Sequence, residues 1–217
     1  MHYLAGDGTF KDIDTNLRLD KSGAYYIIDN GLYNVAFTGN FSKGNWDVAY
    51  EVPRPVKQKF RDPGKPRAPV TRIRWKVLSY GYWDAQKNLY QILEDAQSVP
   101  PVVSGNTIDY PEIFSGIDIR YICGNVSVKE EIVLSQPGRD NLPDPADYGL
   151  SRENTYFVVA MEFFLTPANI NVFARRAGAK IPIKQGNTFF STVMIPSILK
   201  MPIRPCISSS RKIMPGR

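Results

Sequence analysis

Four carboxylates are the side chains of this chain best suited to acid–base chemistry: Asp118, Glu130, Glu131 and Glu162. A glycosidase-type reaction requires two carboxyl groups about 5–10 Å apart in a cleft, where one donates a proton and the other acts as base or nucleophile. No motif typical of such enzymes flanks any of the four. We therefore predict no catalytic residue and no enzyme, and we keep a glycosidase as a minor alternative.

Histidine, cysteine and aspartate do not occur in the patterns of metal or nucleophilic sites. The only histidine, His2, stands at the amino end, which counts against Ser-His-Asp and Cys-His catalysis and against histidine-based metal sites. Asp12 and Asp14 lack the remaining ligands of a calcium loop. Cys123 and Cys206 fit no zinc spacing and are expected to be unpaired, although a disulfide between them stays open. We predict no metal and no cofactor.

One aromatic cluster is the only candidate binding surface. It consists of Trp75, Tyr80, Tyr82 and Trp83. Rings of this kind can stack on the sugar units of a polysaccharide when they are gathered on one exposed face. They are more often part of a core or of turn packing, because aromatic side chains bury large areas. The cluster therefore supports a carbohydrate- or surface-polymer-binding module only as an alternative.

The positive charge is concentrated in two stretches. Nine of the 27 cations follow residue 162, where there is no acid, which leaves 18 cations against all 21 acids in residues 1–162. Pro53–Pro69 carries five prolines and six cations but only one aromatic ring, so it lacks the stacking platform of a nucleic-acid binder. We expect this stretch to be a solvated crossover loop and predict no nucleic-acid partner. No apolar stretch approaches the roughly 18 residues of a membrane span.

The elements that would position these residues are strands, and the clearest pair lies in Thr107–Leu134. Ile117, Ile119 and Tyr121 alternate with charged residues, as on a strand with one buried face. A four-residue loop from Gly124 to Ser127 would set Arg120 opposite Glu131, whereas a two-residue loop would set Arg120 opposite Lys129. Opposed unlike charges are favoured over like charges, so we predict the longer loop. Glu130 then lies on the apolar face beside Tyr121, as a partly exposed side chain or as a binding carboxylate.

The rest of the chain reads as short strands separated by turns, with almost no amphipathic helix. We predict an all-β fold, an antiparallel β-sandwich or stacked β-sheets built of hairpins. The expected parts are N-terminal hairpins (1–52), a Pro-rich basic loop (53–69), the main sandwich-like region (70–193) and an irregular tail (194–217). The strands are expected at Ala24–Ile28, Leu32–Thr38, Trp46–Val52, Val70–Leu78 and Asn154–Thr166, with a last hairpin of Asn169–Phe173 and Ile181–Phe190.

Two phrases of the sequence resemble one protein family. KDIDTNL (Lys11–Leu17) and the Tyr110–Leu134 phrase, with its Asp118–Ile119 and Lys129–Glu130 steps, are similar to phrases of large secreted or wall-associated bacterial RHS-repeat or DNRLRE-domain proteins. The resemblance implies a β-rich, non-catalytic structural or presentation module whose partners are the other domains of a longer polypeptide. A virion structural protein is a further alternative.

The resemblance also bears on the location of the protein and on the two ends of the chain. The Met1 end shows no signal-peptide pattern, so a secreted or cell-surface location would depend on an upstream signal in a longer parent. Met194–Arg217, with four prolines and no acid, shows no strand or helix periodicity. We interpret this tail as translated out of frame, and the chain as a fragment of a longer protein.

The coding DNA tests this interpretation. In the frame one nucleotide upstream, each codon spans two neighbouring codons of the tail as given. The genetic code then permits an amino-acid string such as KDADTTLYFFKSKDYA, which resembles the phrase that follows the hairpin in that family. We expect this frame to stay open beyond Val193 and to encode such a phrase. A stop codon or an unrelated string would contradict the interpretation. If it holds, the basic tail and Cys206 have no function of their own.

Overall fold

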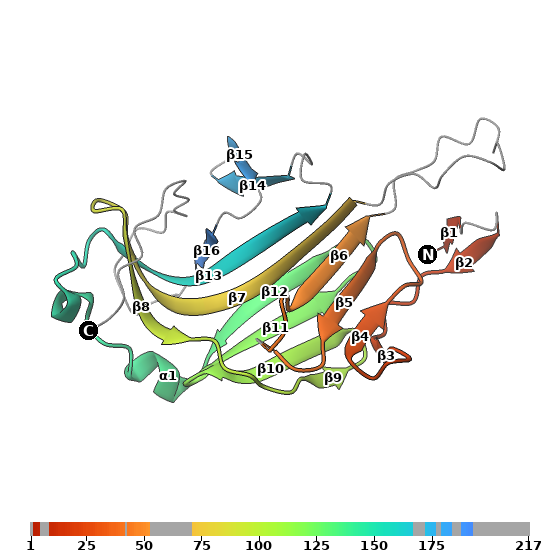
Figure 1. The fold of residues 1–217 in the computed structure, drawn as a ribbon, viewed down its shortest axis with the longest axis horizontal. Helices are drawn as coiled ribbons and strands as arrows, with labels where there is room; N and C mark the ends of the chain where they lie inside the picture. The colour runs from red at the N-terminus through yellow and green to blue at the C-terminus, as the bar shows by residue number, and fades with distance from the viewer. Residues whose placement is uncertain are drawn as a thin grey trace.

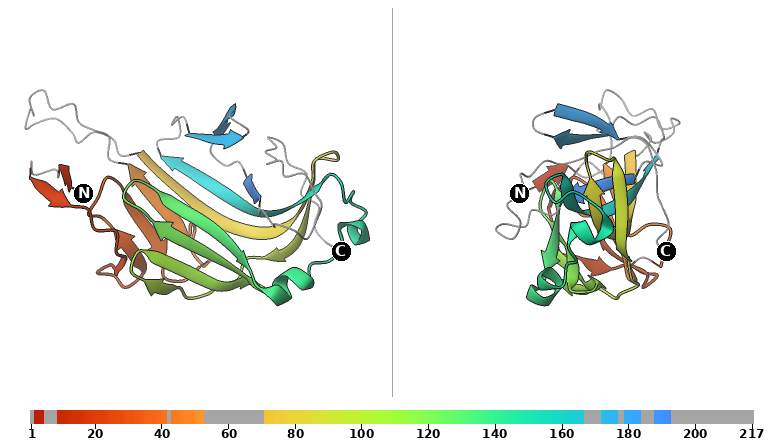
Figure 2. Two further views of the ribbon diagram at one scale, coloured as in Figure 1. Left: turned by 180° about the vertical axis from the view of Figure 1, so that it is seen from behind. Right: turned by 90° about the vertical axis from the view of Figure 1, so that its left-hand side faces the viewer.

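Two stacked antiparallel β-sheets form the body of the molecule in the computed structural model (Figure 1). The structure describes residues 2–4, 9–41, 43–52, 71–166, 172–176, 179–183 and 188–192. Apolar residues of one face of each sheet form a shared core between the two layers, and Figure 2 shows the layers from two further directions. The predicted all-β antiparallel fold is confirmed.

The larger sheet has eight strands in the order β16-β13-β7-β6-β5-β4-β3, and β8 also pairs with β7. β13 covers one edge of the long strand β7, while β6 and β8 share the other edge. The strands are β3 (Arg18–Leu19), β4 (Tyr25–Ile28), β5 (Asn34–Thr38), β6 (Val48–Val52), β7 (Thr71–Asp84), β8 (Leu89–Asp95), β13 (Thr155–Thr166) and β16 (Thr188–Thr192).

The smaller sheet has four strands in the order β12-β11-β10-β9. They are β9 (Val102–Ser104), β10 (Thr107–Phe114), β11 (Ile117–Cys123) and β12 (Val128–Leu134). Two further hairpins stand apart from both sheets: β1 (His2–Leu4) with β2 (Phe10–Asp12), and β14 (Val172–Arg176) with β15 (Ala179–Ile183). In the described parts of the chain, no helix is both long and apolar enough to cross a membrane.

The predicted register of the β11–β12 hairpin is confirmed. Arg120 lies opposite Glu131, and Ile119 lies opposite Ile132. Gly124 to Ser127 form the connection, and the Gly124 N–H donates to the Ser127 carbonyl at 2.8 Å. The hydroxyl of Tyr33, which directly precedes β5 of the larger sheet, donates to the Gly124 carbonyl at 2.6 Å. The loop is thus tied to the opposite layer.

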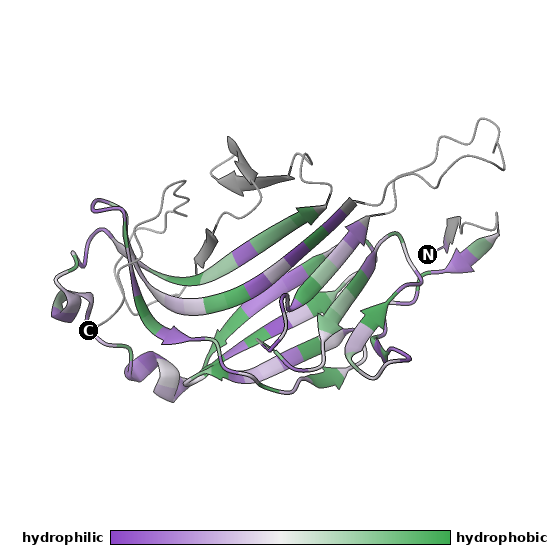
Figure 3. Cartoon of the chain, in the orientation of Figure 1, coloured by the Kyte–Doolittle hydropathy of each residue, from purple (hydrophilic) through white to green (hydrophobic). Residues whose placement is uncertain are grey.

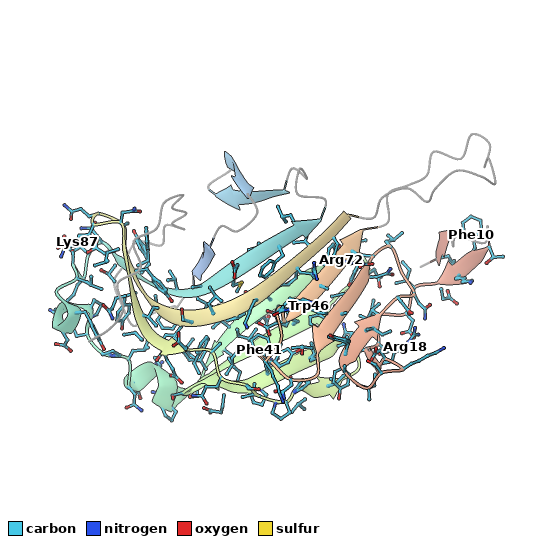
Figure 4. The ribbon with its side chains drawn as sticks, in the orientation of Figure 1. Phe10, Arg18, Phe41, Trp46, Arg72 and Lys87 are labelled. Atoms are coloured by element: carbon cyan, nitrogen blue, oxygen red, sulfur yellow. The ribbon has the colours of Figure 1, made fainter. Side chains whose placement is uncertain are left out.

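Alternation along the strands places the core between the sheets. The inner residues Ile117, Ile119, Tyr121 and Cys123 of β11 are fully buried, while the residues between them are half-buried. Figure 3 shows the resulting bands of apolar and polar residues along the strands. Aromatic rings join the layers: Phe37 with Tyr121 at 5.3 Å, Phe41 with Tyr110 at 4.3 Å and Tyr80 with Phe114 at 5.0 Å between ring centroids. The labelled Phe41 lies deep between the sheets in Figure 4.

A β-bulge in β7 reverses which side chains face the core. Met161 pairs with Val77 and Ala160 pairs with Ser79, so Leu78 is the extra residue. Before the bulge Trp75 and Val77 belong to the core, and after it Tyr80 and Tyr82 do. The opposite face carries a second apolar cluster of Trp83, Tyr90, Val158 and Ala160.

Several predicted boundaries differ from the structure. β7 continues to Asp84 instead of ending at Leu78, and β5 begins at Asn34 instead of Leu32. Instead of one last hairpin, β14 pairs with β15 and β16 joins β13. The first predicted part, 1–52, shares a sheet with the third through β6 and β7; residues 53–69 and 194–217 lie outside the described ones.

Two short helices lie between β12 and β13: α1 (Gln136–Asp140) and the 3₁₀-helix η1 (Pro145–Tyr148). The side chain of Ser135 caps α1 by accepting from the Gly138 N–H at 3.0 Å. Gly138 lies against Gly116, which has a φ of +73° in the turn between β10 and β11. A Cβ on Gly116 would lie 2.4 Å from the Gly138 Cα, so neither residue has room for a side chain.

We expect Gly116→Ala to destabilise the protein much more than the matched change Gly23→Ala. Both glycines have a φ of +73°, but a Cβ at Gly23 would meet nothing within 4 Å. Gly23→Ala should therefore cost only the left-handed conformation, about 1–2 kcal/mol. Gly116→Ala should cost roughly 1–3 kcal/mol more, because it overpacks the contact with Gly138. Urea unfolding measures the difference, and equal losses would show that the contact is unimportant.

Candidate functional site

A buried polar chain that joins the two sheets is the candidate site. It consists of Trp75, Tyr121 and Glu130. The Trp75 indole N–H donates to the Tyr121 hydroxyl oxygen at 3.3 Å, and the Tyr121 hydroxyl is hydrogen-bonded to the Glu130 carboxyl. Tyr121 is fully buried, whereas Trp75 and Glu130 are half-buried. The chain runs from β7 in the larger sheet to β11 and β12 in the smaller one.

Strand geometry explains why an acid faces the core here. Glu130 pairs with Tyr121, and side chains of directly opposed residues lie on the same face of a sheet. Tyr121 and its neighbours Ile119 and Cys123 face inward, so Glu130 faces inward as well. Ile132, two residues along β12, also packs against the core. This confirms the expected position of Glu130 beside Tyr121.

The surroundings of Glu130 favour its neutral form. Burial raises the pKa of the Glu130 carboxyl to about 7, although the hydrogen bond with Tyr121 acts in the opposite direction. Burial also raises the pKa of the Tyr121 hydroxyl well above its ordinary value. Near neutral pH the pair can therefore hold or release one proton at the carboxyl. An acid with a pKa near the working pH can act as a general acid or base if a substrate reaches it.

The other carboxylates predicted as candidates do not join Glu130. Glu131 is the next residue on β12 and faces the opposite side of the sheet, and Asp118 lies on that outer face too. Glu131 accepts from the Lys129 ammonium at 2.6 Å, an interaction that lowers the pKa of its carboxyl. Asp118 accepts from the Glu112 N–H at 2.8 Å. Glu162 lies on β13 opposite Lys76.

The outer face of the smaller sheet is instead an array of alternating charges. Arg120 lies between Asp109 on β10 and Glu131 on β12. Its guanidinium bonds the Asp109 carboxylate at 2.5 Å, and this contact raises the pKa of Arg120. These side chains are partly exposed. Ion pairs of this kind contribute at most about 1 kcal/mol each, and they hold the strand register rather than a reactive geometry.

Sequence reasoning did not single out two fully buried aspartates. Asp47 accepts from the Val77 N–H at 2.8 Å, and its own N–H donates to the Trp75 carbonyl at 2.8 Å. Asp84 accepts from the N–H groups of Gln86 and Lys87, both at 2.9 Å, and closes the β7–β8 turn. Asp84 could have been found from the residues that follow it, because an aspartate at a turn bonds backbone two residues on. No sequence signal marks Asp47, whose partners lie about 30 residues away.

The four rings predicted as a binding surface are divided between two faces of β7. Trp75, Tyr80 and Tyr82 belong to the core between the sheets, and Trp83 belongs to the apolar cluster on the other face. Tyr80 is 8% exposed, and Tyr82 and Trp83 are each 3% exposed. Tyr82 and Trp83 are neighbours on one strand, so their side chains face opposite sides of the sheet. The bulge at Leu78 decides that Tyr80 and Tyr82, and not Trp83, lie on the same face as Trp75. Stacking on a sugar would require these rings to leave their packing.

The remaining reactive side chains are isolated from one another. Cys123 is a free, buried thiol, and burial raises its pKa to about 12. His2 lies 2.7 Å from the Asp12 carboxylate on the exposed β1–β2 hairpin. Among the described residues, no group of three or more histidine, cysteine, aspartate or glutamate side chains could hold a metal ion. Cys206 lies outside the described residues.

Comparisons with known proteins give no family or fold assignment. We find no match to this chain among protein-family models, curated proteins or solved structures. The resemblance to RHS-repeat and DNRLRE-domain proteins therefore stays a prediction.

Stability should fall as pH rises, because of Glu130. An unfolded glutamate titrates near 4.5 and the folded Glu130 near 7, so the folded state binds the extra proton between these values. The contribution of Glu130 to the free energy of unfolding should therefore be fully present below about pH 4.5 and fall by roughly 3 kcal/mol by about pH 8. Glu130→Gln, which cannot ionise, should remove this loss and be more stable than the wild type at pH 8.

Urea unfolding at pH 5, 6, 7 and 8 measures this dependence. Glu131→Gln is the matched control, since its side chain is adjacent in sequence but faces solvent. The control should keep the wild-type fall in stability between pH 5 and 8. If Glu130→Gln shows the same fall as the wild type, the acid responsible is another one.

Proposed function

We propose that this chain is a non-catalytic structural or presentation module of a larger protein. Its main task is to hold a stable two-layer β scaffold that carries or spaces other domains. The two sequence phrases that resemble those of RHS-repeat and DNRLRE-domain proteins support a large secreted or cell-surface bacterial parent. Fold alone does not indicate function, so the use of the reactive side chains has to support the proposal.

One observation supports it best: the polar groups that could do chemistry hold the two layers together. The hydroxyl of Tyr110 donates to the Thr38 carbonyl at 2.7 Å, and the Tyr121 hydroxyl accepts from the Trp75 indole N–H of the other sheet. The Tyr33 hydroxyl links the β4–β5 connection to the β11–β12 loop. Glu130 is joined to Tyr121 in the same interior. Buried polar groups of this type are satisfied by one another and specify how the layers pack.

The carbohydrate-binding and enzyme alternatives have less support. An open sugar platform needs rings on one exposed face, but Tyr82 and Trp83 are buried on opposite faces of β7. A glycosidase needs two carboxyls in one cleft, but Glu130 and Glu131 project from opposite faces of β12.

A direct assay of the full chain tests the proposal. We expect cooperative thermal unfolding, no hydrolysis of aryl glycosides or soluble polysaccharides, and no change in tryptophan fluorescence with those polysaccharides. Hydrolysis that is lost in Glu130→Gln but kept in Glu131→Gln would contradict the proposal in favour of an enzyme. Saturable quenching of tryptophan fluorescence that is lost in Trp75→Phe or Trp83→Phe, with the melting temperature retained, would favour the carbohydrate-binding alternative.

A further inference from the structure

β12 is an edge strand with a long free side. It ends the four-stranded sheet and, among the described strands, pairs only with β11. It has seven residues, whereas β9 at the other edge of that sheet has three. Proteins usually keep edge strands short or otherwise block them, because unpaired N–H and C=O groups are a template for another strand. A free edge of this length can therefore pair with another strand whose side chains complement those of β12.

Two backbone hydrogen bonds at the two ends of the hairpin identify which backbone groups point outward. Gly124 donates to Ser127, and Ser135 donates to Gly116. In an antiparallel ladder only every second opposed pair exchanges hydrogen bonds. Counting along the register, Arg120 with Glu131 is a bonded pair, whereas Tyr121 with Glu130 is not. The N–H and C=O groups of Glu130, and of the residues two positions away on either side, therefore point away from β11.

We propose that β12 pairs antiparallel with β12 of a second copy of this chain, about a two-fold axis that passes at Glu130. This arrangement makes an isologous dimer, in which the same surface is used by both copies. The outward N–H and C=O groups of Val128 then face those of the partner's Ile132, and the groups of Ile132 face those of the partner's Val128. The groups of Glu130 face those of the partner's Glu130. Three opposed pairs would form roughly six backbone hydrogen bonds. Two four-stranded sheets become one continuous sheet.

Charge complementarity selects this register and this occupant. With the axis at Glu130, Lys129 lies opposite the partner's Glu131, and Glu131 lies opposite the partner's Lys129. An axis at Lys129 or at Glu131 would instead oppose two lysines or two glutamates, which is unfavourable. Within one copy, the Lys129 ammonium and the Glu131 carboxylate already lie 2.6 Å apart on the outer face. They can therefore exchange partners across the axis with little movement.

The inner face of the joined sheet is also compatible with this register. Val128 lies opposite the partner's Ile132, and both side chains pack against the core of their own copy. The only like-charged pair is Glu130 with the partner's Glu130. Each of these carboxyls is bound to the Tyr121 of its own copy, in surroundings that favour the neutral acid. Direct opposition of the two acids is therefore tolerated.

Two charge variants of the full chain test the proposal. Lys129→Glu puts glutamate opposite the partner's Glu131, and Glu131→Lys puts lysine opposite the partner's Lys129. We expect the wild type to dimerise with concentration at pH 6 in low salt, and each variant alone to associate at least tenfold more weakly. An equimolar mixture of the two variants should dimerise like the wild type, because every charged pair is then complementary. Sedimentation velocity measures all four samples.

The outcomes are distinct. A wild type that stays monomeric at millimolar concentration would overturn the proposal. If circular dichroism shows that both variants are folded, a mixture that associates no more tightly than either variant alone would also overturn it. If Glu131→Lys does not fold, because its lysine opposes Arg120, Val128→Pro takes its place. That change removes one outward N–H and leaves the β11 ladder intact, so it should abolish the dimer. If neither Lys129→Glu nor Val128→Pro weakens the dimer, the interface lies elsewhere and the proposal is overturned.

Discussion

The packing of Tyr121 between the two sheets is the interaction on which the rest of the structure depends. Its ring contacts Phe37, Trp75 and Tyr110, which come from both layers. Its hydroxyl accepts from Trp75 and is hydrogen-bonded to Glu130. A buried tyrosine provides a large apolar area but needs partners for its hydroxyl. Both requirements are met only when β11 and β12 pair in one register, with Tyr121 opposite Glu130.

The register explains what the sequence could predict. The alternation of Ile117, Ile119 and Tyr121 with charged residues is a local signal, and Arg120 distinguishes between two loop lengths through a partner on the next strand. Both signals lie within one hairpin, so the fold class, the loop and the position of Glu130 follow from the sequence. The contacts of Tyr121 with β5 and β7 cannot be predicted from the sequence. Nothing in the sequence specifies which distant strand will cover Tyr121, or with which of its faces.

The failures have a common physical origin in single residues that change a periodic pattern. Leu78 as one extra residue in β7 places Tyr80 and Tyr82, instead of Trp83, on the face of Trp75. Strand alternation alone predicts the opposite grouping, since the bulge arises in the pairing with β13. The capping of α1 by Ser135 was also missed, because Pro137 and Gly138 look like loop residues unless the contact between Gly138 and Gly116 is known. The pairing of β16 with β13 was also not predicted, because β14 and β15 lie between these two strands in the sequence.

Glu130 shows how a structural role and an apparently reactive group can coincide. A raised carboxyl pKa often marks an active site, but structural networks raise pKa values too. Glu130 has a single identified side-chain partner, Tyr121, and its neighbour Glu131 faces the other way. Apolar residues could fill the same space at lower cost, so the acid needs a reason to be kept. Glu130 lies opposite Tyr121 in only one register of β12 relative to β11. That register also decides which backbone groups and charges β12 presents at its free edge.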